Sequence, residues 1–343
     1  AEDTYQQALG ELDFVWRQLF ESTTAYDKFL DERLLWIRTG ELPDWKTITS
    51  ILQPLAIFVS TSHWQQLADA LLTLNSNSWI LIIGLILFIT LSKQSHQMRN
   101  ALKESGSKVG QLRHDRFTNT IKALGWTVLL ALRWPMLFLS LGLHLLGSEA
   151  VSVVQDFSPP TLSQGQFVSG LGYAFYRIGI FALFFELFYT LCKPYGLLVV
   201  HFCWDYANTR LLAREIRRLE FIFLPITFIV ASTVAFDPVS LGSGLSRLSF
   251  LIVMIALGLF LSHILAPKHG AVKGFYATNP TSPLTWFRYI WIALGIALPV
   301  MLAGLALAGY TYTAIQFGTR LLNMLWLIAG IIFFNQLIER WVI

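Results

Sequence analysis

Seven stretches of this 343-residue chain are long enough and apolar enough to cross a lipid bilayer. The hydrocarbon core of a bilayer is ~30 Å thick and takes about 20 helical residues. Each stretch has about that length and holds no more than two charged residues. They lie at residues 70–92, 121–146, 167–192, 219–236, 248–266, 288–313 and 320–338. We therefore predict an all-α fold, a polytopic transmembrane helical bundle of about seven spans.

The composition agrees with this fold class. Hydrophobic residues make up 55% of the chain and charged residues 13%, and the mean hydropathy is +0.55. Soluble domains carry about 25% charged residues. These values exclude an intrinsically disordered chain and argue against an ordinary soluble enzyme.

The basic residues alternate between successive connections. From the first connection to the sixth, the numbers of Lys and Arg are 7, 0, 5, 1, 3 and 0. Lys and Arg are retained on the cytoplasmic side of a membrane. We therefore predict that the N-terminal segment lies outside the cytoplasm and that the C-terminal end lies inside.

The charges also divide the chain into two regions. Residues 1–69 hold eleven acidic and five basic residues, a net charge of −6, and residues 70–343 hold ten acidic and twenty basic residues, a net charge of +10. Regions of opposite sign indicate different environments. We predict an extracytoplasmic helical segment with its linker at 1–69 and a transmembrane domain at 70–343. The basic pI then records membrane orientation, and no nucleic-acid partner is expected.

Apolar residues recur every three or four positions near the N-terminus. The series begins with Tyr5, Leu9, Leu12 and Trp16, which predicts one long amphipathic helix, or two in line, ending near Gly40. Another helix must cover its apolar stripe, either in the membrane domain or in a helical extracytoplasmic domain upstream. We favour the second, because the chain begins at Ala1 without a methionine and resembles a piece of a longer protein.

Three ionisable residues fall deep inside the predicted spans: Arg133, Arg177 and Glu186. A charge at the bilayer centre is costly, so such residues are candidates for an ion or proton path. The alternative is a structural clamp to backbone carbonyls, lipid phosphate or a neighbouring subunit. We favour the clamp, because two arginines and one acid form no known relay.

A basic amphipathic helix is predicted after the third span. It carries Arg210, Arg214, Arg217 and Arg218 at steps of three and four residues. Such a helix suits the anionic inner leaflet of a membrane. The alternative is that these arginines only fix the topology, and the sequence does not decide between the two.

Small residues surround Pro299 in the sixth span, including Gly295, Ala303 and Gly304. Small residues let membrane helices approach closely, which predicts that this span packs in the interior of the bundle.

The sequence shows no catalytic constellation, no cofactor motif and no metal site. The nearest pair of metal-binding residues, His201 and Cys203, is two positions apart, so the two side chains would point to different faces of a helix. We expect no enzyme activity and no cofactor.

Two segments carry a resemblance to a known family. The first is Leu30-Asp31-Glu32-Arg33-Leu34-Leu35-Trp36-Ile37, which precedes Pro43 and the first span, and the second runs from Lys193-Pro194-Tyr195-Gly196 to Arg218. Both resemble the corresponding parts of the large mechanosensitive channels of the MscS superfamily. The order of elements is also similar, with a helix outside and basic connections inside.

The resemblance implies a homoheptamer in a bacterial inner membrane, with a periplasmic N-terminal segment and a cytoplasmic C-terminal end. In that family, a helical periplasmic domain and peripheral membrane helices precede three pore-forming helices and a cytoplasmic cage. No pore residue can be identified in this chain. The resemblance therefore implies the peripheral part, which contacts membrane lipid and passes tension to a pore.

We rank three hypotheses for the function. The first is a tension-sensing membrane domain of a channel that releases ions and small osmolytes on hypo-osmotic shock. The second is a secondary transporter or other polytopic membrane protein; a transporter would show inverted repeats with broken helices. The third is a membrane enzyme, for which no set of residues is present.

Overall fold

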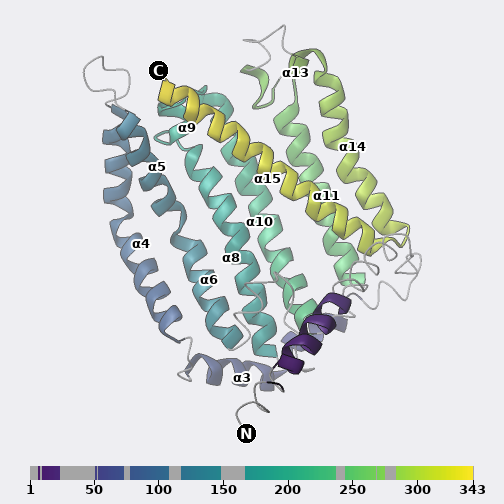
Figure 1. Cartoon of the computed structure of the whole chain (residues 1–343). Helices are drawn as coiled ribbons and strands as arrows, with labels where there is room; N and C mark the ends of the chain where they lie inside the picture. The colour runs from purple at the N-terminus through teal and green to yellow at the C-terminus, as the bar shows by residue number, and fades with distance from the viewer. Residues whose placement is uncertain are drawn as a thin grey trace.

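A computed structural model of the whole chain gives the arrangement of the helices (Figure 1). The structure describes residues 7, 10–23, 51, 53–72, 78–107, 117–147, 167–236, 244–267, 269–274 and 283–342. Within these ranges the chain is almost entirely helical and contains no strand. The predicted all-α class is confirmed.

Among the described residues, six helices are long and apolar enough to cross a membrane, and a bent pair of helices gives a seventh span if it is counted as one. The six are α4 (Ser78–Ser107), α8 (Phe167–Leu191), α10 (Tyr206–Phe236), α11 (Gly244–Leu265), α14 (Arg288–Leu307) and α15 (Thr311–Val342). The pair is α5 (Phe117–Ala131) with α6 (Arg133–Leu146), which meet at 50°. About seven spans, as predicted, are therefore present.

Short helices fill the ends of the bundle. They are η1 (Gln53–Phe58), α3 (Thr61–Leu72), α9 (Leu197–Val200) and α13 (Pro283–Trp286). Several long helices exceed the ~20 residues that a bilayer needs, because they continue as polar helix beyond the apolar stretch. In α4 the apolar part gives way to a polar end that carries Lys93, Arg99 and Lys103.

The second span is broken at Leu132, between α5 and α6. Pro135 explains the break, because proline has no N–H group to donate to the carbonyl of Ala131 four residues earlier. The neighbouring bonds remain, from Leu132 N to Val128 O at 2.9 Å and from Met136 N to Leu132 O at 2.9 Å. The helix therefore bends here and then continues.

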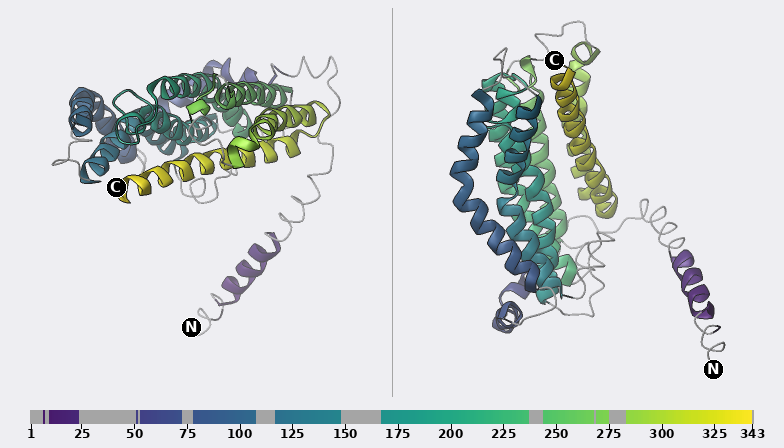
Figure 2. Two further views of the ribbon diagram at one scale, coloured as in Figure 1. Left: turned by 90° about the horizontal axis from the view of Figure 1, so that it is seen from above. Right: turned by 60° about the vertical axis from the view of Figure 1, so that its left-hand side comes forward.

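The spans lie side by side, with α4 and α5 at one edge and α14 at the other (Figure 1). The helix α15 crosses one face of this array obliquely, as both views in Figure 2 show. A large cluster of buried apolar residues joins α8, α10 and α11, and includes Phe185, Phe223 and Met254. This cluster lies towards the end of the bundle at which α9 is found (Figure 1).

Glycines set the close approach of α6 to α8. A Cβ atom added to Gly142 would lie 2.5 Å from the backbone N of Tyr176, and one added to Gly172 would lie 2.8 Å from the backbone N of Leu146. Both distances are too short for a real side chain. Small residues of this kind let membrane helices pack backbone to backbone.

The sixth predicted span, α14, lies at the edge of the array and not in its interior. Its fully buried residues are Pro299, Leu302 and Ala306, which form one face at a helical spacing. That face packs on α11. Most of the remaining residues of α14 are exposed in the described part of the chain, although α14 also contacts α15, so its small residues do not mark an interior position here.

The N-terminal helix is described only in part, at residue 7 and residues 10–23. This stretch extends away from the bundle (Figure 2). Its apolar side chains are exposed, with Leu12 at 68% and Trp16 at 66%. No described residue covers the stripe, and the remainder of the predicted helix, including Gly40, lies outside the described residues.

The two ends of the bundle carry different elements (Figure 1). The N-terminal stretch and α3 lie at one end, while α9, α13 and the end of α15 lie at the other. We call the second end the α9 end. The termini of the helices that flank the basic connections meet there, including those of α4, α5, α8 and α10, which agrees with the predicted alternation.

Candidate functional site

An ionic cluster joins α8 to α10 near the α9 end. Nη1 of Arg217 donates hydrogen bonds to Oε1 of Glu186 at 3.0 Å and to Oε2 of Glu220 at 2.8 Å. The guanidinium also lies 4.0 Å from the ring centroid of Tyr189. We call these four residues the ionic cluster. It ties two spans together through a charge that is half-buried, since the Arg217 side chain is 43% exposed and that of Glu186 only 12%.

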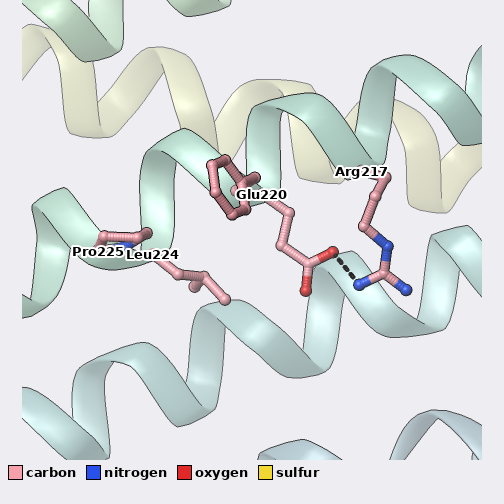
Figure 3. Close-up of a pocket in the computed structure, with 5 residues that line it drawn as sticks. Arg217, Glu220, Leu224 and Pro225 are labelled. Atoms are coloured by element: carbon pink, nitrogen blue, oxygen red, sulfur yellow. Dashed lines mark hydrogen bonds and ion pairs between the residues drawn. The ribbon is translucent and has the colours of Figure 1, made fainter.

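Two residues of the ionic cluster, Arg217 and Glu220, line a shallow cavity of about 210 Å3 on α10 (Figure 3). Arg217 and Glu220 form its polar end, and Leu224 and Pro225 form its apolar end. The arrangement follows from the helical repeat. Residue 220 lies three positions after residue 217, residue 224 four positions after 220, and residue 225 eight positions after 217, so they share one side of α10.

A second ionic group joins α10 to α11. Nη1 of Arg218 donates to Oε1 of Glu215 at 2.7 Å, and Oε2 of Glu215 lies 3.2 Å from Nδ1 of His263. Glu215 is buried, with 6% of the residue exposed. The Glu215 carboxylate therefore pairs with an arginine of its own helix and joins α10 to α11 through His263.

The four arginines predicted to contact lipid all lie in the first half of α10, in a helix that continues into the fourth span. Arg217 and Arg218 are ion-paired, as described above. Arg210 and Arg214 are exposed and form no ion pair with a described residue. The partners Glu215 and Glu220 were not identified from the sequence, although the spacings Glu215 to Arg218 and Arg217 to Glu220 are both the three-residue step that favours a pair on a helix.

The three intramembrane charges do not come together as one site. Arg177 lies over aromatic rings, 5.3 Å from the centroid of Phe181 and 6.0 Å from that of Tyr173. It is nine residues from Glu186, which is two and a half turns and places the two on opposite sides of α8. Glu186 instead pairs with Arg217, a partner from the next long helix that sequence reasoning did not find.

The third intramembrane charge, Arg133, begins α6 at the bend in the second span. Its guanidinium lies 5.6 Å from the ring centroid of Trp134. Its buried Nε atom has no hydrogen-bond partner within the described chain, and the same is true of Nε of Arg99 on α4.

Lys193 follows directly after α8 and lies among these cations. Burial lowers the pKa of its ammonium group from 10.5 to about 8. Glu186 opposes that change, while the positive charges of Arg99, Arg217 and Arg133 add to it. The ammonium also lies 4.9 Å from the ring centroid of Tyr189. Positive charge from several helices therefore gathers at this point.

The described ranges offer no candidate metal site. No group of three or more His, Cys, Asp or Glu side chains comes together there to hold a metal ion. What the arrangement can do chemically is to hold charged groups of a ligand or of the membrane at the α9 end of the spans.

Comparison with known proteins defines the class. A family model described as mechanosensitive ion channel inner membrane domain 1 matches residues 78–343. The chain belongs to this family, and the resemblance seen in its sequence is confirmed. No solved structure matches the chain.

Two proteins of Escherichia coli strain K12 are similar to the chain. The mechanosensitive channel MscK is 25% identical over 321 residues, which cover 91% of this chain and 26% of MscK. The miniconductance mechanosensitive channel MscM is 25% identical over 346 residues, which cover 97% of this chain and 28% of MscM. The chain therefore spans about a quarter of the length of these relatives.

Proposed function

We propose that this chain is the peripheral, tension-sensing membrane domain of a bacterial mechanosensitive channel. In this proposal the whole protein releases ions and small osmolytes when membrane tension rises on hypo-osmotic shock. The observation that carries the proposal is the family match over residues 78–343. Both relatives described above are named as mechanosensitive channels, which supports it.

The arrangement of the helices suits a tension sensor. Tension can shift a conformational equilibrium only if the two states interact differently with the bilayer, for example through a difference in membrane area. The spans lie side by side, and the outer ones bury little of their surface, with 11% of the apolar window buried in α4, 17% in α14 and none in α15, whereas α8, α10 and α11 bury 50%, 44% and 39%. Lipid can therefore act directly on the outer helices.

We further propose a multi-pass location in a bacterial inner membrane. The N-terminal segment would be periplasmic and the α9 end cytoplasmic, which is supported by the alternation of basic connections. Assembly would be homo-oligomeric, and the resemblance to the MscS superfamily implies seven copies. The role is that of a channel domain without enzymatic chemistry.

Arg210, Arg214, Arg217 and Arg218 would contact anionic lipid of the inner leaflet. In this proposal Arg210 and Arg214 contribute most, because they are exposed and have no carboxylate partner among the described residues. Arg217 and Arg218 are shared with carboxylates. The attraction is worth ~1 kcal/mol for each unpaired cation near the surface.

Patch-clamp recording on the full-length protein tests this function. The protein would be expressed in bacterial spheroplasts that lack other mechanosensitive channels, with spheroplasts from the same strain without the protein as the control. We expect currents that open with suction and close when it is released. A protein that gives no tension-gated current but accumulates a solute in vesicles would be a secondary transporter, and the channel proposal would be wrong.

A further inference from the structure

An apolar cavity of about 500 Å3 lies between α6, α8 and α10. Every residue that lines it is apolar, among them Phe138 of α6, Phe175 and Ile178 of α8, and Phe228 of α10. Ligand sites commonly have volumes of ~300–1,000 Å3 and largely apolar walls. This cavity falls in that range, and nothing polar in its wall could hold a charged molecule.

The apolar cavity continues into the cavity of the ionic cluster. Leu224 and Pro225 line both. The two together form one groove along α10 from Arg217 to Phe228, a distance of ~16 Å at 1.5 Å for each helical residue. That is about half the ~30 Å thickness of a hydrocarbon core, which is the length that one acyl chain occupies in one leaflet.

The wall contributed by α8 also changes from apolar to charged along the groove, with its charged end beside Arg217 of α10. Phe175, Ile178 and Glu186 are separated by three and eight residues, so they share one side of the helix, and Lys193 follows two residues after the end of the helix. Phe184 lies on the opposite side of α8, where its ring contacts Trp326 of α15 at 5.1 Å. The groove therefore opens on the face of the array that α15 does not cover.

The polar end of the groove has an excess of positive charge. We call Arg99, Arg133, Lys193 and Arg217 the cationic end, because Lys193 interacts electrostatically with the other three. Arg217 already engages the carboxylates of Glu186 and Glu220. The two Nε atoms of Arg99 and Arg133 are buried without a hydrogen-bond partner in the described ranges. An anion that accepts hydrogen bonds would satisfy this end.

We propose that this groove binds one phospholipid of the membrane leaflet at the α9 end, with its phosphate at the cationic end and one acyl chain in the apolar cavity. The inference rests on the proposed membrane function, because it requires the chain to lie in a bilayer. A phosphate diester carries the negative charge and the acceptor oxygens that arginine and lysine side chains bind. The excess of positive charge favours an anionic headgroup over a zwitterionic one.

Photolabelling of the full-length protein tests the site. The protein would be reconstituted in phosphatidylcholine vesicles that contain phosphatidylglycerol with a diazirine in its acyl chain. After irradiation, labelled peptides would be identified by mass spectrometry. We expect labels concentrated around Phe138, Phe175 and Phe228, several-fold above those on the exposed residues Ile82 and Ile86 of α4. Equal labelling of the groove and of α4 would overturn the proposal.

Substitutions at the two ends of the groove give independent tests. Leu224→Trp fills the cavity, whereas Ile222→Trp adds the same side chain to an exposed position of α10 outside the groove. Lys193→Gln removes a charge of the cationic end, whereas Lys273→Gln removes an exposed charge elsewhere at the same end of the bundle. We expect labelling to fall several-fold in the first variant of each pair and to stay unchanged in the second. Unchanged labelling in both Leu224→Trp and Lys193→Gln would overturn the site.

Two further experiments test the headgroup preference and distinguish a bound phospholipid from a bound free anion. The diazirine probe with a phosphatidylcholine headgroup should label the groove less than the phosphatidylglycerol probe does. Excess inorganic phosphate should leave the labelling unchanged, and its displacement of the label would assign the site to a free anion instead. None of these measurements uses channel current, so a lipid site can be present in a protein that fails the patch-clamp test, and the reverse.

Discussion

Arg217 of α10 reaches Glu186 of α8 across 31 residues of sequence, with Nη1 and Oε1 3.0 Å apart. The same guanidinium lies against Tyr189, one turn along α8 from Glu186. A charge in the membrane region is costly, and a partner of opposite sign lowers that cost. The pair thus links the facing sides of α8 and α10, and it places the polar end of the groove described above.

Loss of Glu186 should destabilise the bundle moderately. In Glu186→Gln, Arg217 keeps Glu220 but loses its partner on α8, and we expect a loss of ~1–2 kcal/mol, less than for a fully buried pair because Arg217 is half-exposed. Thermal unfolding in detergent would measure it. A double-mutant cycle with Arg217→Gln should show coupling. Asp13→Asn, which breaks the exposed pair of Asp13 and Arg17 at 2.9 Å, is the control and should have little effect; equal losses would argue against the interpretation.

Contact between α6 and α8 should tolerate no side chain at Gly142. A Cβ there would lie 2.5 Å from a backbone nitrogen, so Gly142→Val must push the helices apart, at a cost of ~1–3 kcal/mol or more. Gly125→Val is the matched control, because nothing lies within 4 Å of a Cβ at Gly125. We expect a lower unfolding temperature and a shifted tension threshold only for Gly142→Val. A threshold that both variants leave unchanged would contradict a sensing role for this contact.

The helix α15 should be held less firmly to the array without Trp326, although Phe333 and Gln336 also attach it, through Phe202 and Trp204. Trp326 contacts the rings of Phe184, Phe185 and Phe188 at centroid distances of 5.1, 5.4 and 5.5 Å. Beyond Gly318, the described part of α15 has no fully buried residue. Trp326→Ala should therefore speed hydrogen exchange in α15 while that of α8 changes little. Trp341→Ala, at a site 66% exposed, should change neither; equal exchange in the Trp326→Ala variant and the unmodified protein would show other attachments.

Lys193 should contribute a rise in stability with pH between about 8 and 10.5. Its folded-state pKa of about 8 lies below the ordinary 10.5, so between these values the unfolded chain binds more protons than the folded one. The free energy of unfolding then increases with pH in that interval. Lys193→Gln should flatten this rise when unfolding temperatures are compared from pH 7 to about 10. Arg210→Gln is the control and should keep the rise. A slope that survives in Lys193→Gln would assign the effect to another group.

Native cysteines provide a test of orientation. Cys203 is exposed and Cys192 is buried, and Cys203 lies close after α9. An impermeant maleimide should label Cys203 only after the inner membrane is opened, and Cys192 should stay unlabelled. In a Cys203→Ser background, Ser107→Cys should behave as an internal site and Ser158→Cys as an external one. Labelling of Ser107→Cys in intact spheroplasts would reverse the proposed topology.

Properties that depend on short stretches of chain could be predicted from the sequence. A span must satisfy its own backbone hydrogen bonds within lipid, so hydrophobic length alone indicated seven spans and the all-α class. The break at Leu132 was missed, although Pro135 is a local signal for it. The position of α14 was predicted incorrectly, because small residues indicate close approach but do not say which helix approaches.

The site depended on contacts between distant residues. The sequence identified Glu186 as an intramembrane acid and, separately, Arg217 as part of a basic helix. It also indicated that the connections at the α9 end are basic. It could not pair the two residues, because partner choice depends on the order of the helices in the array and on the rotation of each about its axis. Those are set by packing, such as the backbone contact at Gly142. The amino-acid sequence by itself thus determined the number of spans and their alternating charge, since these are local properties, whereas the ion pairs and the groove were decided only by the tertiary structure, since they require α6, α8 and α10 to be neighbours.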